Sequence, residues 1–243
     1  MATLRRERLE DAIEVVRLDR PQARNALDSA ALSELEAALS ELAADAGLRV
    51  LVLSTTSTRA LCAGADVAEV LDDAGGLARM QAFTRVYAAV EAFPAPTVCV
   101  CVGNVVGAGA EIAAGCDLRV GADNLKLAWA GARLGVPVGP ARLTPLVGLA
   151  AAKDLVFTGR TLNMAQARAL GLVHRTAPAA GAEAAAIALA RALAAHPPEG
   201  MRRLKAMFRE LTGAEAHVAR ENELLVAWQR TGAGLPQGGL RGR

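Results

Sequence analysis

The first part of the chain alternates between short apolar runs and amphipathic stretches. Residues 12–18 alternate polar and apolar positions, which predicts a half-buried strand, and residues 4–9 are a weaker candidate for its hairpin partner. Asp28 is placed to cap a helix whose leucines form one apolar stripe, Leu32, Leu35, Leu39 and Leu42. Residues 50–53 are continuously apolar, as expected for a strand that is covered on both faces.

The same alternation continues through the middle of the chain. Residues 77–93 predict a helix, and the prolines of 94–96 end it. Further strands are predicted at residues 97–102, 118–120 and 125–128, with a short helix at 108–115. Strands that alternate with helices imply an α/β domain in which most strands pair in parallel.

Beyond about residue 180 the pattern becomes helical only. Three helices are predicted in succession, over residues 179–195, 200–211 and 214–228. We therefore expect an α/β core over residues 1–195, followed by a helical region over 196–243. The glycine- and arginine-rich end of the chain, residues 231–243, is expected to be loose.

Composition narrows the possible partners. Hydrophobic residues make up 53% of the chain, enough for a large core, and the formal net charge is +2. That charge is too balanced for a nucleic-acid or anionic-membrane surface, and 3% aromatic residues supply few platforms for base stacking. The charged N-terminus lacks the apolar stretch of a signal peptide, and glycines and Glu111 interrupt the most apolar run, 97–115. We expect a cytoplasmic protein with neither nucleic acid nor membrane as a partner.

The cysteines and histidines do not suggest a metal site. The chain has four cysteines, Cys62, Cys99, Cys101 and Cys116, and three widely separated histidines. Their spacing matches no metal-ligand pattern, so we expect no metal. Cys99 and Cys101 should point to the same face of a strand, and packing in a reducing compartment is the simplest role for all four cysteines.

Two glycine-containing segments follow predicted buried strands, at residues 60–66 and 103–111. Small residues there let a ligand approach the backbone, and a helix that begins beyond the loop leaves N–H groups without partners. Two such groups could hold a thioester oxygen as it becomes an enolate oxyanion. From the residues alone, two ordinary loops of an α/β sheet are an equal alternative. A dinucleotide-binding loop is disfavoured because the third glycine of its signature is absent.

Three segments are similar to the signature blocks of the crotonase superfamily, the enoyl-CoA hydratases and isomerases. They are residues 20–27, 61–66 and 103–111, in the family's order and spacing, and segments 116–119 and 159–173 extend the match. The resemblance covers roughly residues 10–225. It implies a spiral of ββα units with a helical C-terminal region used for trimerisation, and trimers of this family often pair into hexamers. It also implies an acyl-CoA or enoyl-CoA substrate of fatty acid metabolism, with coenzyme A as part of the substrate and no separate cofactor.

The resemblance assigns roles to particular residues. The N–H groups of Ala65 and Ala108 would form the oxyanion hole, although the family usually has glycine at the second position. Glu111 would be the acid or base, and a glutamate that merely favours a helix start is the alternative. The residues expected to contact substrate are Arg24, Ala26, Ala63, Gly64, Asp66, Val67, Gly107, Gly131 and Leu134.

The chain departs from the family where the second catalytic glutamate should stand. Gly131 occupies that position, and no acidic residue occurs between Asp123 and Asp154. The loop at 134–142 is also shorter than the family's. Because hydration in this family holds water between two carboxylates, hydratase activity should be weak. A Gly131→Glu change is expected to raise it, or at least not to lower it.

Coenzyme A contacts also differ from the family pattern. Gln22 and Ala68 replace lysines that are common in the family. Arg24 could reach a phosphate instead, and a solvated surface arginine is an equal alternative. His174 lies where the family has an edge strand, so a structural role is expected for it. The sequence therefore predicts an enoyl-CoA hydratase-like lyase or isomerase. Decarboxylation, or acyl-CoA binding without catalysis, remains open.

Overall fold

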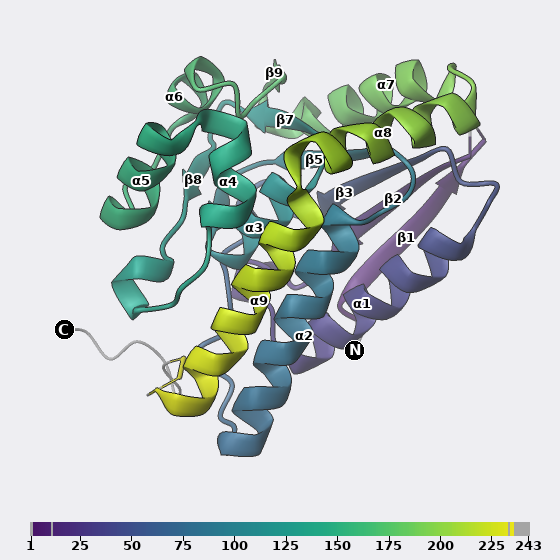
Figure 1. Cartoon of the computed structure of the whole chain (residues 1–243). Coiled ribbons are helices and arrows are strands. Elements are labelled where there is room, and N and C mark those ends of the chain that lie inside the picture. The colour runs from purple at the N-terminus through teal and green to yellow at the C-terminus, as the bar shows by residue number, and fades with distance from the viewer. Residues whose placement is uncertain (1, 11, 233, 236–243) are drawn as a thin grey trace.

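The computed structural model describes residues 2–10, 12–232 and 234–235, which form two sheets with helices around them (Figure 1). The larger sheet has the strand order β1 (Leu4–Leu9), β2 (Ile13–Leu18), β3 (Val50–Thr55), β5 (Thr97–Cys101), β7 (Leu118–Ala122) and β9 (Arg175–Ala177). β1 is antiparallel to β2, and the other neighbours in this sheet are parallel. The smaller, parallel sheet has the order β4 (Ala60–Cys62), β6 (Asn104–Val106) and β8 (Lys126–Ala128).

Successive turns of the chain each add one strand to both sheets. β3 is followed by β4, β5 by β6, and β7 by β8. α2 (Asp73–Glu91) follows the first of these pairs, α3 (Ala108–Gly115) the second, and α4 (Pro140–Val147) the third. This is the spiral of ββα units that the resemblance implied, and the mainly parallel pairing predicted from the pattern is confirmed.

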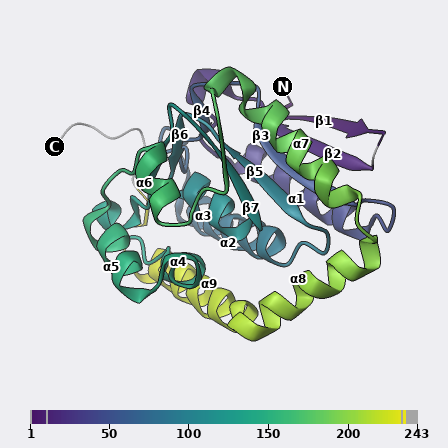
Figure 2. The same cartoon turned by 90° about the horizontal axis from the view of Figure 1, so that it is seen from above.

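The two faces of the larger sheet are covered by different helices (Figure 2). α7 (Ala182–Ala194) packs on one face through its buried alanines Ala182, Ala186, Ala190 and Ala194. α1 (Ser29–Ala44), α2 and α3 cover the other face. Alternate strand residues therefore point into different layers: Val98 and Val100 face α7, whereas Cys99 and Cys101 face the α1–α3 side, together as predicted.

The C-terminal helices lie against the core. α9 (Ala214–Thr231) runs along α2 and also contacts α4, as Figure 1 shows. α8 (Pro198–Thr212) bridges between α7 and α9, and its Lys205 is buried, with Nζ 2.7 Å from the Asp117 carboxylate. Helix α9 is thereby placed to contribute residues to whatever site lies between the sheets and α2.

Most of the predicted elements are present, with shifts at the ends. α2 begins at Asp73, four residues before the predicted start, because the carboxylate of Asp72 caps it by accepting the Gly75 N–H. Several short helices were not predicted: α5 (Leu149–Thr158), α6 (Met164–Ala169) and α4, with 3₁₀ turns at Pro21–Ala23, Gly131–Leu134 and Ala179–Gly181. Most of the tail expected at 231–243 lies outside the described residues.

Two further expectations concern the surface and one histidine. None of the helices in the described ranges is long and apolar enough to cross a membrane.

His174 lies just before the edge strand β9, and its Nδ1 accepts the N–H of Arg119 at 3.1 Å. Burial lowers the pKa of His174, as does the nearby Arg119 charge. These contacts support the structural role expected for this side chain.

Candidate active site

A cavity of about 590 Å³ lies between the ends of β4 and β6, the turn after β8, and helices α2 and α9. Eleven of the twelve predicted site residues line it: Arg24, Ala26, Ala63, Gly64, Ala65, Asp66, Val67, Gly107, Ala108, Gly131 and Leu134. Glu111 is the exception, because its side chain lies behind the cavity wall. The three signature segments therefore do converge on one place.

The two predicted oxyanion donors lie on adjacent loops. β4 and β6 are parallel neighbours, so the segments that follow them leave the same edge of the small sheet. A methyl group on Gly107 would come within 3.8 Å of the Gly64 Cα, which shows how closely the loops approach. Within the described residues, neither the Ala65 N–H nor the Ala108 N–H donates a hydrogen bond to the protein. Two unpaired backbone donors thus belong to the wall of one cavity.

Glycine at 109 explains how α3 comes so close to β4. A Cβ at Gly109 would lie 2.4 Å from the carbonyl oxygen of Cys62, a distance that no side chain tolerates. Gly107, the residue before the helix, has a φ of 55°, which favours glycine. Ala108 is the first residue of α3, and its N–H is therefore one of the donors that a helix leaves unsatisfied.

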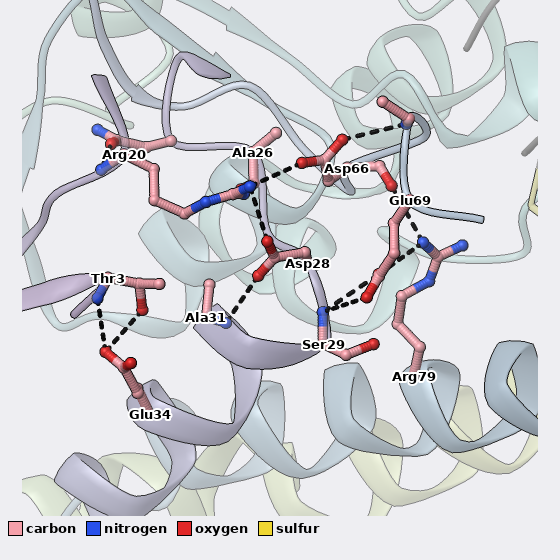
Figure 3. Close-up of polar contacts among 12 residues, drawn as sticks. Thr3, Arg20, Ala26, Asp28, Ser29, Ala31, Glu34, Asp66, Glu69 and Arg79 are labelled. Carbon is pink, nitrogen blue, oxygen red and sulfur yellow. Dashed lines mark hydrogen bonds and ion pairs between the residues drawn. The ribbon is translucent and has the colours of Figure 1, made fainter. Parts of the chain in front are cut away.

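An arginine holds the segment after the first donor from one side (Figure 3). Arg20 Nη2 lies 3.0 Å from Asp66 Oδ2 and 2.7 Å from Asp28 Oδ2, and its Nη1 donates to the carbonyl oxygen of Ala26. Asp66 was predicted to contact substrate. It does line the cavity, but its carboxylate also forms this ion pair with Arg20.

A second arginine, from α2, holds the same segment from the other side, as Figure 3 also shows. Arg79 Nη1 donates to the carbonyl oxygen of Asp66 and to Glu69 Oε2, both at 3.0 Å. Glu69 in turn accepts the N–H of Ser29 at the start of α1. Arg79 is 3% exposed, so this is a buried tie between two helices and the Ala65 loop. In the sequence, Arg79 is recognisable only as a charged residue on a predicted helix.

Glu111 is in the first turn of α3, as predicted, and its side chain is fully buried. Arg142 Nη1, from α4, lies 3.1 Å from Glu111 Oε2 and 2.8 Å from Glu221 Oε1 of α9. Burial raises the pKa of Glu111 to about 7, because it penalises the charged form. The Arg142 charge lowers that pKa, and the Glu221 charge raises it.

The second oxygen of Glu111, Oε1, lies beside the indole of Trp129, whose N–H lowers the pKa of Glu111. In the described part of the chain, neither Glu111 Oε1 nor Trp129 Nε1 has a hydrogen-bond partner. Both side chains meet at Gly139, where an added Cβ would lie 3.5 Å from Glu111 Oε1 and 3.1 Å from Trp129 Cδ1. The adjacent Val138 lines the cavity. Glu111 therefore has one oxygen held by Arg142 and one oxygen beside the Trp129 indole.

Tyr87 of α2 joins the cavity to this charged cluster. It lines the cavity, and the Arg142 guanidinium lies over its ring, 5.0 Å from the centroid. Burial raises the pKa of Tyr87 well above its ordinary value, and the Glu111 charge adds to the effect. Its hydroxyl makes no hydrogen bond with any described residue. No sequence motif indicated that Tyr87 belongs to the site.

At Gly131 the structure shows a tight turn. A Cβ there would lie 3.0 Å from both the Val136 carbonyl oxygen and Val138 Cγ1, and the Gly131 carbonyl accepts the Val136 N–H. The carboxylate that does approach Glu111 is Glu221, from the other end of the chain. No local pattern in the sequence indicated it.

The cavity wall is largely apolar, with cations also present. Its apolar residues include Met80 and Phe83 of α2, Leu225 of α9, and Leu235, which follows α9 in the chain. Among the described residues, Arg24 and Arg133 are the arginines that line it. Arg133 is tied to the Gly159 carbonyl oxygen at 2.7 Å, whereas the Arg24 side chain makes no hydrogen bond with a described residue. An apolar pocket with a few cations suits an acyl chain attached to an anionic group.

Comparison with known proteins identifies the family. Residues 8–229 match the family Enoyl-CoA hydratase/isomerase, so the chain belongs to this family. It is 37% identical over 168 residues to the "Probable enoyl-CoA hydratase echA8" of Mycobacterium tuberculosis, an alignment covering 68% of this chain. A Thermus thermophilus protein, provisionally named an enoyl-CoA hydratase, is 36% identical over 238 residues, which cover 93% of this chain and 92% of its own length.

Solved structures agree on the fold. An enoyl-CoA hydratase from Bacillus anthracis aligns with a TM-score of 0.81 at 25% identity, covering 98% of this chain and all of the other. An enoyl-CoA hydratase/isomerase from Xanthobacter autotrophicus aligns at 0.85, with 22% identity and coverage of 97% and 89%. In sequence, the match spans 65% of the length of the Mycobacterium relative and 55% of a related mouse protein.

Proposed function

We propose that the chain binds an acyl-CoA or enoyl-CoA thioester in the 590 Å³ cavity and stabilises its enolate with the N–H groups of Ala65 and Ala108. The observation that carries the proposal is the pair of unpaired backbone donors on adjacent loops at one apolar cavity. Donors fixed where negative charge develops lower the barrier to enolate formation. Coenzyme A enters as part of the substrate, and no separate cofactor is needed.

Glu111 is the proposed acid and base. A carboxylate whose pKa is raised to about 7 exists in both protonation states near neutral pH, which suits proton transfer in either direction. With Gly131 in place of a second carboxylate, there is no matching pair to hold water. Moving a proton between substrate carbons needs one carboxylate, so isomerisation or slow hydration fits better than rapid hydration.

A second candidate is acyl-CoA binding without catalysis. The observation in its favour is that the Glu111 side chain is completely buried, paired with Arg142, and does not line the cavity. In that case the glutamate would stabilise the packing of α3 against α4. The oxyanion loops would then serve to bind the thioester.

The two candidate functions predict different turnover for an ester that binds, so turnover and binding are measured on the same sample. We expect at least one member of a panel of acyl-CoA and enoyl-CoA esters, crotonyl-CoA included, to bind and to turn over slowly. Glu111→Gln should then lower the rate by about 10²- to 10⁴-fold while changing affinity only a few-fold. Binding without turnover of any ester would favour the binding protein. Failure of every ester to bind would contradict both.

A further inference from the structure

Three charged side chains from three helices meet behind the cavity wall. They are Glu111 of α3, Arg142 of α4 and Glu221 of α9, with exposed fractions of 1%, 3% and 7%. A single nitrogen, Arg142 Nη1, lies 3.1 Å from Glu111 Oε2 and 2.8 Å from Glu221 Oε1. We call these three side chains the Glu–Arg–Glu cluster. It joins the C-terminal helix to the proposed acid and base.

Helix α9 holds the arginine through more than one contact. Besides Glu221, Asn222 accepts a hydrogen bond from Arg142 Nη2 at 3.4 Å, and Asn222 Nδ2 donates to the Thr84 carbonyl oxygen of α2 at 3.1 Å. The other oxygen of Glu221 accepts the Ala141 N–H at 2.8 Å. The position of Arg142 is therefore set by α9, and the position of Glu111 Oε2 is set by Arg142.

The hydrogen bonds divide the two carboxylates into different roles. Each Glu221 oxygen accepts a hydrogen bond, one from the Ala141 N–H and one from Arg142. In Glu111, Arg142 holds Oε2, whereas Oε1 has no partner among the described residues. Two carboxylates share one guanidinium in a buried site, so retaining one proton relieves the excess negative charge. The oxygen that Arg142 does not hold is Glu111 Oε1, so the proton is assigned to that oxygen.

We propose that Arg142 and Glu221 are positioning residues for Glu111: Arg142 fixes one carboxylate oxygen, and Glu221 neutralises Arg142 so that Glu111 keeps an exchangeable proton on the other. The C-terminal helix thus completes the acid/base centre, in which the carboxylate expected at position 131 is absent. This inference rests on the proposed role of Glu111 in proton transfer.

Other groups face the cluster from neighbouring elements and must be included in any pH dependence. Tyr87 of α2 interacts with both Glu111 and Glu221, and the Arg142 guanidinium stands over its ring. Cys62, at the end of β4, lies close enough to raise the pKa of Tyr87. Trp129 contributes an uncharged indole beside Glu111 Oε1. Among the described residues, Arg142 is the cation that contacts Glu111.

The test is to titrate Glu111 in variants that remove each partner's charge. Carbon-13 NMR of glutamate-labelled protein follows the Glu111 carboxyl directly, with Glu111→Gln identifying its signal, and needs no turnover. Glu221→Gln keeps size and removes negative charge, so the Glu111 titration should move to lower pH. Arg142→Met removes positive charge, so it should move to higher pH. The control is Glu183→Gln. Glu183 of α7 is a part-buried carboxylate paired with Arg17 of β2, and its replacement should leave the Glu111 titration unchanged.

The pH–rate profile on the best substrate provides the second readout. In this profile, the ionisation assigned to Glu111 should move to lower pH in Glu221→Gln and to higher pH in Arg142→Met. A purely structural role of the two residues would not shift the profile. If Arg142→Met fails to fold, Glu221→Gln decides alone. An unchanged Glu111 titration in Glu221→Gln, in an enzyme that turns over, would overturn the positioning role. Shifts as expected, in a protein that turns over no ester, would instead refute the proposed function.

Discussion

Glu111 shows how the surroundings of one residue set its chemistry. Burial raises its pKa to about 7, from an ordinary value of 4.5. The folded protein therefore holds a proton between these two pH values that the unfolded chain has already lost. The stability that this proton gives is fully present below about pH 4.5 and disappears as the pH rises through about 7.

We predict that Glu111→Gln flattens this part of the pH dependence of stability. From pH 4.5 to above pH 7, the free energy of unfolding of the wild type should fall relative to that of the variant, by up to about 3 kcal/mol. Urea denaturation at several pH values measures the difference, and Glu210→Gln on the exposed side of α8 is the control. Parallel curves for wild type and Glu111→Gln would show that Glu111 ionises as readily in the folded protein as in the unfolded chain.

The sequence could locate Glu111 but not its partners. A glutamate in the first turn after a glycine loop has a local signature, and so do the loops that carry Ala65 and Ala108. Arg142 and Glu221 have none, because charged residues on helices normally face solvent. Here they are buried because they neutralise each other across two helices that only the tertiary fold brings together.

At the scale of elements, predictability followed the strength of the local pattern. The strand at Thr97–Cys101 and the helix at Ala108–Gly115 were predicted almost residue for residue, since β-branched runs and glycine boundaries are clear signals. The short helices α4 and α5 were missed. Pro145 lies inside the first and Gly148 separates the two, so neither has a long enough apolar stripe to stand out.

The buried tie from α2 to the Ala65 loop gives an element-scale prediction. Arg79→Met removes the donors to the Asp66 carbonyl and to Glu69, and should cost about 1–3 kcal/mol of stability. Because Ala65 directly precedes Asp66, kcat should fall more than substrate affinity. Arg85→Met is the matched control. The Arg85 side chain forms an ion pair with Glu36 but is 54% exposed, so its replacement should change stability by less than about 0.5 kcal/mol. Equal effects of the two substitutions, measured by denaturation and steady-state kinetics, would contradict the role of this buried tie.

The turn at Gly131 changes the expectation drawn from sequence. A glutamate there was expected to restore hydration, but its Cβ would press against the Val136 carbonyl oxygen and Val138 at 3.0 Å. We now predict that Gly131→Glu lowers the melting temperature and does not raise hydratase activity. Gly131→Ala, which adds the Cβ alone, should lower the melting temperature similarly. A hydration rate above wild type in Gly131→Glu would show that the turn adapts.

The whole molecule leaves one apolar helix face uncovered. On α8, Leu204, Met207, Phe208 and Leu211 are 51% to 79% exposed. Leu225 of α9 is buried in the core, whereas Leu204 and Phe208 of α8 face outward. Apolar surface gathered on one helix is typical of an association site.

We therefore predict self-association as a trimer or a dimer of trimers through α8. Phe208→Arg should shift the mass measured by light scattering toward a single chain. Phe157→Arg is the control, because Phe157 is equally exposed, at 73%, but lies on α5. A wild-type protein that stays a single chain at micromolar concentration would contradict the prediction, as would an unchanged assembly of Phe208→Arg.

Two backbone N–H groups are proposed to stabilise the enolate of a thioester, and one of these donors can be removed by a single substitution to proline. Ala108 is the first residue of α3, a position that tolerates proline, so Ala108→Pro deletes the donor and keeps the helix. Ala108→Gly is the matched control, because it keeps the N–H and adds no bulk. On the best acyl-CoA substrate, kcat of Ala108→Pro should be about 10²- to 10³-fold lower, while Ala108→Gly stays close to wild type. A folded Ala108→Pro protein with wild-type kcat would contradict the account.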